Sequence, residues 1–370
     1  MLNALTEQSG SGVRFWSIGK ELARLGHSIL FLERSITKDV RRENEGVRYH
    51  AIIETGVLWL DIFRATWLNV FYGLLFRPAY VFALKPLPNS CLPAIFLKTI
   101  LRCKIILDID DLDLAYYPAG LRQNLVHACF KFFPSHFDLI TTHNQHLRSL
   151  IINEIGISPE KIYFLAQGIE AERFVQSHPN HHYQRNWGID PTDRVLVYSA
   201  SLGITSDFDY VLPMLTDFLR SCSDIKVLVI GSGIRKPDFI KKVEAQGLQE
   251  RIIFTGYIPH AHMPGVLKLG TVGINYMAPT EANQCRASIK VREYIAAGLN
   301  VVCNPVGDGE IFQDHVILCE RIEEFPTAIR KALDPQGQNK AKEAQRFVER
   351  NYSWPGLVED FLSHLLDSQK

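Results

Sequence analysis

Short apolar runs alternate with segments of helical spacing along most of this 370-residue chain. The alternation is most regular in the second half, where each apolar run of strand length precedes a helical pattern. Such a rhythm predicts a parallel, doubly wound α/β sheet. The strands predicted in this half are 195–198, 227–230, 252–254, 272–276, 301–303 and 316–318.

The first half follows a similar rhythm. After a turn at residues 10–12, apolar positions from Phe15 to Leu25 share one face of a helix, which Gly26 ends before a strand at 28–32. A helix is also predicted at 93–101. Later strands are predicted at 80–83, 104–111 and 139–143.

The length of the chain predicts two domains, because it exceeds what one typical core accommodates. A polar run at 176–185 is interpreted as a linker or surface loop between them. We place the domains at 1–170 and 171–350, with a closing helix in 351–370.

Residues 57–76 form the most apolar segment, and they are long enough to span a bilayer. Asp61, Arg64 and Asn69 interrupt the segment, so a core helix of the first domain is the favoured interpretation. The alternative is a surface helix that dips Trp and Phe side chains into a membrane, which would suit a lipid-linked acceptor.

Composition narrows the class of protein. Lys+Arg and Asp+Glu both number 40, so bulk charge gives no argument for nucleic acid. The seven cysteines are scattered and never in Cys-x-x-Cys spacing, which predicts buried thiols in a reducing compartment. Residues 1–7 lack the basic flank and long apolar core of a signal peptide, so a cytoplasmic protein is expected.

Two of the histidine pairs could suggest a metal, but both fall in polar segments. His181 and His182 lie in the predicted polar loop, and His260 and His262 lie in a turn. Solvated surface side chains are the expected state of all four, so we predict no metal site.

The stretch from Ala287 to Gly298 carries the clearest candidate chemistry. Ser288 stands where a helix N-cap belongs, and Gly298 supplies the left-handed residue that ends a helix. Lys290 and Glu293, three residues apart, share one face. A helix start with a cation nearby suits phosphates, and a carboxylate one turn later can accept two ribose hydroxyls. An ordinary amphipathic helix before a buried strand would show the same pattern.

A second candidate lies where the predicted strand at 104–111 ends in Asp108, Asp110 and Asp111. Ligands of open parallel sheets gather at the carboxyl ends of strands. Three crowded acids repel one another, so at least one should have a raised pKa or a cationic partner, for which Lys85 is the candidate. A structural acid cluster that caps loops is an equal alternative.

The pattern Ser-x-x-Lys-x-x-Glu-Tyr-x-Ala-Ala-Gly-x-x-Val-Val resembles the signature helix of GT-B fold glycosyltransferases of group 1, or family 4. Other segments resemble this family in the same order over roughly residues 10–365. They are the loop Gly10-Ser11-Gly12, the crossing segment Gly168-Ile169-Glu170-x-x-Arg173-Phe174, Gly231-Ser232-Gly233, Phe254-Thr255-Gly256-Tyr257-Ile258 and the closing segment 352–362.

The resemblance implies a fold of two Rossmann-like doubly wound domains that face a cleft, with a C-terminal helix that crosses back to the first domain. Family members normally have a full strand before the glycine loop, whereas about nine residues precede it here. The implied activity is the transfer of a hexosyl group from a nucleotide diphosphate sugar to a hydroxyl acceptor. The resemblance further implies retention of configuration and no metal or other cofactor.

The resemblance also implies residue roles. Glu293 would bind the ribose, while Lys290 and the helix start at Ser288 would bind phosphate. Asp110 stands where family members often have a histidine near the donor sugar, so Asp110 and Glu293 are the catalytic candidates. Further candidates for substrate binding are Gly10, Gly12, Lys85, Asp111, Ser201, Gly231, Gly233, Tyr257, Ile258, Glu281 and Arg286.

Two departures from the family pattern leave alternatives open. Many members clamp the diphosphate with Arg and Lys after the first strand of the second domain, but this chain has Ser201 there. Hydroxyls, helix-start amides, Lys290 and Arg286 would then have to replace the clamp. Cys285 replaces a family glutamate near the sugar, with Glu281 upstream in the same loop. A catalytically silent nucleotide-sugar-binding protein, or another GT-B chemistry such as epimerisation, therefore remains an alternative.

The partners expected are a nucleotide-sugar donor and a glycan or lipid-linked acceptor, with no nucleic acid. Peripheral contact with the inner face of a membrane is the alternative to a purely cytoplasmic location. A dinucleotide-binding protein is disfavoured because no predicted strand is followed by Gly-x-Gly-x-x-Gly.

Overall fold

The computed structural model describes residues 10–35, 41–44, 46–53, 55–204, 206–334 and 338–367. The chain divides into two compact units. The first contains Met1–Gly168, Gln284–Ala287 and Trp354–Lys370, and the second contains Ile169–Asn283 and Ser288–Ser353. The predicted boundaries do not assign Gln284–Ala287 to the first unit, because nothing in their sequence marks that excursion of the chain.

The first unit holds two sheets. In one, β1 and β3 pair in parallel and β2 pairs with β3 in antiparallel, and in the other β4, β5, β6 and β7 are all parallel. The elements are α1 (Gly10–Arg24), β1 (Ile29–Ser35), β2 (Arg41–Asn44), β3 (Val47–Ile53), α2 (Leu58–Phe76), β4 (Tyr80–Leu84), α3 (Pro88–Leu101), β5 (Lys104–Asp108), α4 (Leu121–Phe132), β6 (Leu139–Thr142), α5 (Gln145–Asn153), β7 (Ile162–Phe164) and α15 (Trp354–Asp367).

The second unit is built on one parallel sheet with the strand order β10-β9-β8-β11-β12-β13. All six strands predicted for this half are confirmed. The elements are α6 (Ala171–Gln176), α7 (His181–Asn186), β8 (Arg194–Ser199), α8 (Phe208–Arg220), β9 (Ile225–Ile230), α9 (Lys236–Glu244), β10 (Ile252–Gly256), α10 (Met263–Leu267), β11 (Val272–Asn275), α11 (Glu281–Gln284), α12 (Ile289–Ala296), β12 (Asn300–Cys303), β13 (Ile317–Leu318), α13 (Phe325–Ala332) and α14 (Gln338–Tyr352).

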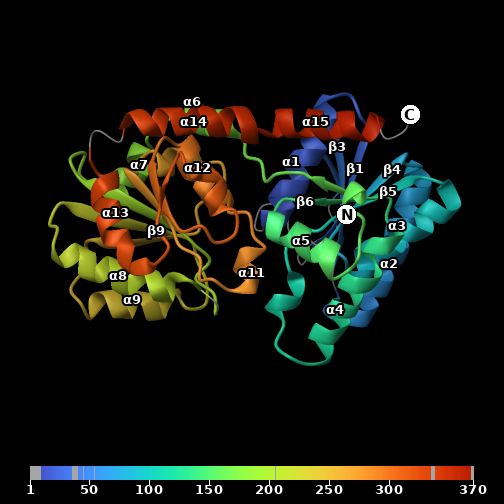
Figure 1. The fold of residues 1–370 in the computed structure, drawn as a ribbon, viewed down its shortest axis with the longest axis horizontal. Helices are drawn as coiled ribbons and strands as arrows, with labels where there is room; N and C mark the ends of the chain where they lie inside the picture. The colour runs from blue at the N-terminus through green and yellow to red at the C-terminus, as the bar shows by residue number, and fades with distance from the viewer. Residues whose placement is uncertain are drawn as a thin grey trace. The chain divides into compact units, whose positions relative to one another are not determined.

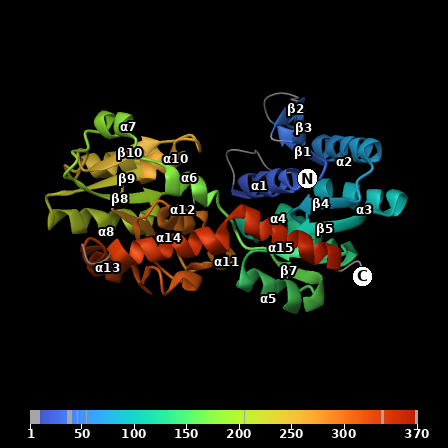
Figure 2. The same cartoon turned by 90° about the horizontal axis from the view of Figure 1, so that it is seen from above.

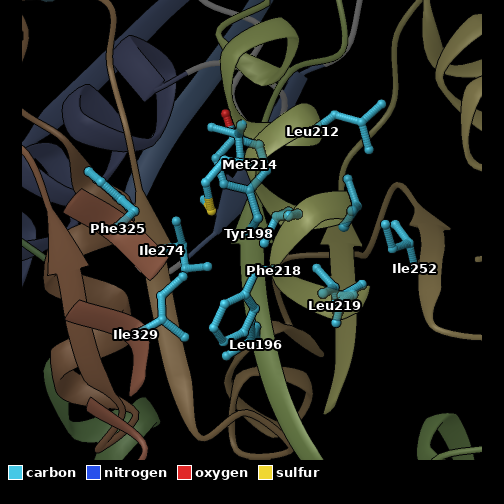
Figure 3. Packing of buried hydrophobic residues seen from close by; sticks show 14 of the residues in the cluster. Leu196, Tyr198, Leu212, Met214, Phe218, Leu219, Ile252, Ile274, Phe325 and Ile329 are labelled. Carbon is cyan, nitrogen blue, oxygen red and sulfur yellow. The ribbon is translucent and has the colours of Figure 1, made fainter. Parts of the chain in front are cut away.

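Helices cover both faces of this sheet, which explains why its strands are apolar throughout. Successive residues of β8 point to opposite faces. Leu196 and Tyr198 pack with α8 and α13 on one face, as Figure 3 shows, whereas Val195 and Val197 belong to the core under α12 and α14. In Figure 1, α8 and α9 lie below the sheet of this unit, and α12 and α14 lie above it.

The closing helix α15 packs on the first unit. Val358, Phe361 and Leu365 are buried together with Ile18 of α1, and Leu357 is partly buried against the same cluster. The helix begins at Trp354, whose ring fills the space beside Gly168: a Cβ at that glycine would lie 2.6 Å from the indole.

Three sequence predictions need correction. Gly10, Ser11 and Gly12 form the first turn of α1, not a loop before it, and the expected preceding strand falls outside the described residues. The presumed loop at 176–185 contains the start of α7. The favoured core-helix interpretation of residues 57–76 is also wrong, because α2 leaves Trp59, which is 68% exposed, and other large apolar side chains in solvent.

The cysteine prediction holds in large part. All seven cysteines are free thiols, and six are buried, while Cys222 is half-buried. Burial raises the pKa of the Cys303 thiol well above its usual range, which is typical of an inert core residue.

Candidate functional site

The winding of the second unit's sheet reverses at β8. The strands β9 and β10 follow on one side of β8, and β11, β12 and β13 follow on the other. In open α/β sheets, ligands bind outside the carboxyl ends of the strands at such a switch point. The loops after β8 and β11, together with the helix that follows them, therefore define the candidate site of this unit.

Side-chain hydrogen bonds fix these loops to one another. The Asp207 carboxylate, in the loop after β8, accepts from the Ala278 amide of the loop after β11 at 3.2 Å. Asn304, after β12, accepts from the Met277 amide at 3.1 Å and donates to the Met277 carbonyl at 2.7 Å. The loops at the carboxyl edge of the sheet are thus joined by specific side-chain hydrogen bonds, in addition to the hydrogen bonds between the strands.

The start of α12 lies in space beside the carboxyl end of β11, because Ser288 contacts Asn275. Ser288 occupies the predicted N-cap position, but its hydroxyl donates to Asn275 Oδ1 at 3.2 Å and makes no cap bond to the first-turn amides. The expectation of a side-chain cap is therefore wrong, because Asn275 competes for the hydroxyl. The backbone amide of Ser288 donates to Asp308 at 2.9 Å.

The end of α12 matches its prediction. Gly298 has a φ of 85°, its amide donates to Ile295, and the Leu299 amide donates to the Tyr294 carbonyl. This pair of bonds is a Schellman motif. It directs the chain into β12.

A buried ion pair stabilises the first turns of α12. Arg292 is fully buried and lies 2.6 Å from Asp308 Oδ2, and its guanidinium also donates to the Ser288 carbonyl at 3.0 Å. The ring of Tyr352 packs against the same guanidinium, 4.7 Å from its centroid. The sequence analysis missed this pair, although an arginine between the core positions Val291 and Tyr294 demands a buried acid.

Glu293 is buried beside the loop that follows β10. Burial raises its pKa to about 7, while Lys290 and Arg173 act in the opposite direction. The Nε2 atom of His260 lies 3.9 Å from Glu293 Oε1. Arg173 in turn lies 3.1 Å from His260 Nδ1 and donates to the His260 carbonyl at 3.2 Å.

His260 therefore corrects a sequence prediction, because it was expected to be a solvated turn residue. Its side chain is only 33% exposed and it links Arg173 to the candidate ribose carboxylate. No local pattern brings these three residues together, since they come from α6, the loop after β10, and α12. Arg173 does lie in the crossing segment, where sequence similarity gives the one available signal.

The two predicted glycines after β9 allow the loop after β8 to approach. A Cβ at Gly231 would lie 1.9 Å from the Ala200 carbonyl oxygen, and one at Gly233 would lie 2.2 Å from that of Leu202. No side chain fits at either position without backbone movement. The exposed residue Ser201 lies in the loop that these glycines contact.

A cation that the sequence analysis missed lies at the end of β10. A Cβ at Gly256 would be 3.3 Å from Lys236 Nζ, which places this ammonium group beside the Phe-x-Gly segment. Lys236 begins α9 directly after the Gly-x-Gly turn. Of the two predicted base-contact residues, Tyr257 is 56% exposed and Ile258 is buried.

Three residues that the sequence analysis singled out before α12 lie in different environments. Glu281 is exposed at the start of α11. Cys285 is fully buried in the core of the first unit with Leu107 and Ile109. Arg286 also belongs to the first unit, where its guanidinium lies 3.9 Å from Asp111 and its carbonyl accepts from Asn144 Nδ2 at 2.9 Å.

The first unit gathers acids at the carboxyl edge of its parallel sheet. Lys85 lies 2.6 Å from Asp113 Oδ1 and 3.8 Å from Asp110 Oδ1, so the predicted cationic partner is confirmed. Burial alone would lower the pKa of Lys85, but Asp110, Asp113 and Asp111 together raise it well above its usual value. Asp113 was not among the predicted acids.

The acids of this cluster differ in charge state. Burial opposes ionisation of Asp110, but Lys85 and His143 lower its pKa below the usual value, and the Ser11 hydroxyl adds a hydrogen bond. Because Ser11 lies in the first turn of α1, the helix dipole also favours a carboxylate there. Burial and the charge of Asp110 raise the pKa of Asp111 to about 7.

Asp108 has a structural role. Its two oxygens accept from the Arg14 guanidinium at 3.0 and 3.1 Å, and the same guanidinium donates to the carbonyls of Leu165 and Ala166. This buried pair joins α1 to β5 and to the segment after β7. Asp110 and Asp111 therefore remain the candidate residues for chemistry in the first unit.

Metal sites and membrane-spanning helices are both absent from the described part of the chain. No group of three or more His, Cys, Asp or Glu side chains in the described ranges could hold a metal ion. None of the helices described, α2 included, is long and apolar enough to cross a membrane.

The two parallel α/β units, with a switch-point site in the second, define the GT-B fold. Solved structures agree with it over nearly the whole chain. A glycosyltransferase from Rickettsia africae has a TM-score of 0.77 at 13% identity, with 100% of this chain and 97% of that chain covered. Anabaena HepE in complex with UDP and glucose has 0.75 at 13%, with 98% of each chain covered. WaaG, a glycosyltransferase involved in lipopolysaccharide biosynthesis, has 0.71 at 17%, with 95% and 96% covered.

The model of the family described as glycosyl transferases group 1 matches residues 193–335, which belong to the second unit except for residues 284–287. Residues 193–335 are thus similar to the group 1 glycosyltransferases, and the chain as a whole has the GT-B fold. It is similar to alpha-D-kanosaminyltransferase of Streptomyces kanamyceticus, with 26% identity over 24% of this chain and 22% of that protein. It is also similar to one of the subunits of the phosphatidylinositol N-acetylglucosaminyltransferase of Arabidopsis thaliana, with 22% identity over 55% and 43%. The chain thus spans less than half the length of these curated relatives.

Proposed function

We propose that this protein transfers a hexosyl group from a nucleotide diphosphate sugar to a hydroxyl acceptor. The observation that carries the proposal is the buried carboxylate of Glu293 on α12, one turn after a helix start that lies at the switch point of the sheet. The solved HepE structures, which contain UDP with glucose or UDP-glucose, make uridine nucleotides the first donors to test.

In the proposed donor site, Glu293 accepts hydrogen bonds from the two ribose hydroxyls. Arg173 and His260 position its carboxylate through the contacts described above. The base lies against the backbone of Tyr257 and Ile258. Such a carboxylate is ionised when the ribose is bound, because two donated hydrogen bonds lower its pKa.

The diphosphate needs positive charge, and Ser201 supplies none where many family members have a cation. The first-turn amides of α12 and the Lys290 side chain are the proposed replacements. Lys236, beside Gly256, is a third source of charge for the phosphates or the base. These groups would stabilise the negative charge that develops on the leaving diphosphate without a metal.

Asp110 and Asp111 are the proposed groups for the sugar and acceptor. The bond from the anomeric carbon to the diphosphate oxygen breaks, and a bond to the acceptor oxygen forms on the same face, with retention. Ionised Asp110 would stabilise positive charge on the sugar ring, a role that its low pKa supports. Asp111, with a pKa of about 7, could accept the hydroxyl proton.

For the acceptor we propose a glycan or a lipid-linked molecule in cell-envelope glycan or glycolipid synthesis. Peripheral contact with the inner face of a membrane accompanies this proposal. The exposed Trp and Phe side chains of α2 support such a contact.

A catalytically silent binding protein is the second candidate function. Two observations favour it. Ser201 stands where many family members have a clamp cation. Cys285, which stands where they have a glutamate near the sugar, is buried in an apolar core. Such a protein would bind the nucleotide sugar and release no nucleoside diphosphate. Product analysis without an acceptor would reveal the third alternative, epimerisation of the nucleotide sugar.

The experiment that tests donor binding is a thermal-shift panel of UDP, GDP, ADP and dTDP sugars with the wild type and with Glu293→Gln. A donor present at about 100 times its Kd should stabilise the wild type by about 2.7 kcal/mol. The variant should bind roughly tenfold to a hundredfold more weakly, because two charge-assisted hydrogen bonds are lost. An equal response of wild type and variant would contradict the role of Glu293.

A further inference from the structure

The helices α2 and α3 lie side by side on the first unit (Figures 1 and 2). Each presents an apolar stripe to solvent. In both helices the stripe takes every fourth residue, and residues four apart share one face of a helix. The stripe residues are Trp59, Phe63, Trp67, Phe71 and Leu75 in α2, and Leu92, Phe96 and Ile100 in α3.

The two stripes form one continuous surface, which we call the α2–α3 surface. The Trp67 ring lies 6.1 Å from the Phe63 ring and 5.9 Å from the Phe96 ring of the neighbouring helix. The helices come close at Gly73, where a Cβ would lie 2.4 Å from Leu97 Cδ1. A contiguous apolar patch of this kind marks an interaction site, because monomeric proteins rarely leave one exposed.

Positive charge flanks the α2–α3 surface at one end. Arg77 and Arg102 are the exposed C-cap residues of α2 and α3, and Lys104 is exposed at the start of β5. Both helices lead through short turns into the parallel strands β4 and β5, so their C-termini lie at the same edge of that sheet. The Arg48 guanidinium, 4.8 Å over the Phe76 ring, adds to this cluster.

One acid of a neighbouring element reaches this end of the sheet: Asp138, before β6, lies 2.8 Å from Lys98, and its carboxylate also attracts Lys104. The segment that carries the two helices adds almost no negative charge of its own. In the sequence from 57 to 107 the one acidic residue is Asp61. It is buried, and its carboxylate accepts from the Thr55 amide at 2.6 Å and the Gly56 amide at 3.1 Å. The surface therefore combines exposed aromatic and aliphatic side chains with the positive charge of Arg77 and Arg102 at one end, within a chain whose net charge is zero.

We propose that the α2–α3 surface docks on a bilayer that contains anionic lipids. The apolar stripes enter the interface, where Trp rings are favoured, and the Arg and Lys side chains meet headgroup phosphates. A second copy fits less well, because a two-fold contact through this face would bring the arginines at the ends of α2 and α3 of both copies together. This inference deepens the proposed membrane contact, and only its link to a lipid-linked acceptor rests on the proposed function.

The experiment is cosedimentation of the full chain with vesicles, without donor or acceptor, so that it is independent of any transfer activity. Vesicles of phosphatidylcholine are compared with vesicles that contain about 30% phosphatidylglycerol. We expect binding to the anionic vesicles that weakens with salt and falls roughly fivefold for each cation reversed in Arg77→Glu and Arg102→Glu. The double variant Trp59→Ser, Phe63→Ser should bind at least tenfold more weakly.

A matched control is the double variant Ile204→Ser, Ile234→Ser in the second unit, whose side chains are 79% and 78% exposed. It should bind as the wild type does. Trp59→Phe with Trp67→Phe should keep binding but lose the quenching of tryptophan emission by brominated lipid, a readout that a folding defect would not mimic. Equal binding by the apolar variant and the control, or a dimer that only the apolar variant dissociates without any vesicle binding, would overturn the proposal.

Discussion

At the scale of the residue, the account depends on what surrounds Glu293. A carboxylate buried this deeply is costly unless ligand hydroxyls or cations compensate it. Here Lys290 and Arg173 compensate in part, and the pKa of about 7 shows that burial prevails in the unliganded chain. A bound ribose would supply the remaining hydrogen bonds. Binding of the proposed donor would thus offset part of the cost of burying this carboxylate.

The raised pKa predicts a specific pH dependence of stability. A glutamate titrates near 4.5 in the unfolded chain, so between this pH and about 7 the folded chain retains a proton that the unfolded chain has lost. The contribution of Glu293 to stability therefore falls as pH rises through this window. Between about pH 5 and pH 8 the wild type should lose about 2 kcal/mol relative to Glu293→Gln.

Urea denaturation of both proteins at the two pH values checks this prediction. Asp111 also titrates near 7, but its contribution is common to both proteins and cancels in the difference. Parallel pH profiles of the wild type and the variant would show that Glu293 titrates normally.

Sequence reasoning at this scale found single residues and missed the contacts between distant ones. Glu293, Lys85 and Asp110 are visible because each follows a recognisable helix start or strand end. His260, Lys236 and Asp308 are not, because their roles arise only when three loops meet at one edge of a sheet. Ser288 shows a related limit: the sequence predicts its position, but the competition with Asn275 for its hydroxyl is tertiary.

At the scale of the element, α12 is fixed at both ends by different means. The Schellman motif at Gly298 is local, whereas the Arg292–Asp308 pair at the start depends on a loop from β12. Breaking a buried pair leaves an uncompensated charge. The start of α12, which is the proposed phosphate site, should therefore be sensitive to this pair.

Arg292→Met is expected to lower the free energy of unfolding by about 3–5 kcal/mol, because Asp308 then remains buried without its cation. Adding Asp308→Asn should recover part of the loss. Chemical denaturation measures both effects. For comparison, Arg321→Ala removes an exposed pair with Glu324 and should cost at most about 1 kcal/mol. A similar small loss in Arg292→Met would show that the pair does not support the helix.

The elements themselves follow from the sequence wherever one period dominates. The six strands of the second unit could be predicted because a short apolar run bounded by turn residues is typical of a buried strand. The α2 helix was misjudged for a definite reason: it is apolar nearly all round, so composition suggested burial. The every-fourth spacing from Trp59 to Leu75 is present in the sequence, but only the structure shows that this face lies in solvent.

At the scale of the whole molecule, the chain enters the first unit a second time through Gln284–Ala287. Cys285 anchors that segment in an apolar core, and Arg286 lies beside Asp111. The segment leads directly into Ser288 and α12. The chain therefore runs from the neighbour of Asp111 to the start of α12 within a few residues.

The central claim is that this GT-B protein transfers a sugar and that Glu293 holds the donor. Its most direct test is the release of nucleoside diphosphate from the donor found in the thermal-shift panel, measured with candidate glycan and lipid-linked acceptors. The comparison uses the wild type, Glu293→Gln, and Glu349→Gln as a matched change at an exposed position of α14. We predict acceptor-dependent release by the wild type and Glu349→Gln, and at least a tenfold loss in kcat/KM for Glu293→Gln. Donor binding without release for any acceptor, or equal rates for all three proteins, would contradict the account.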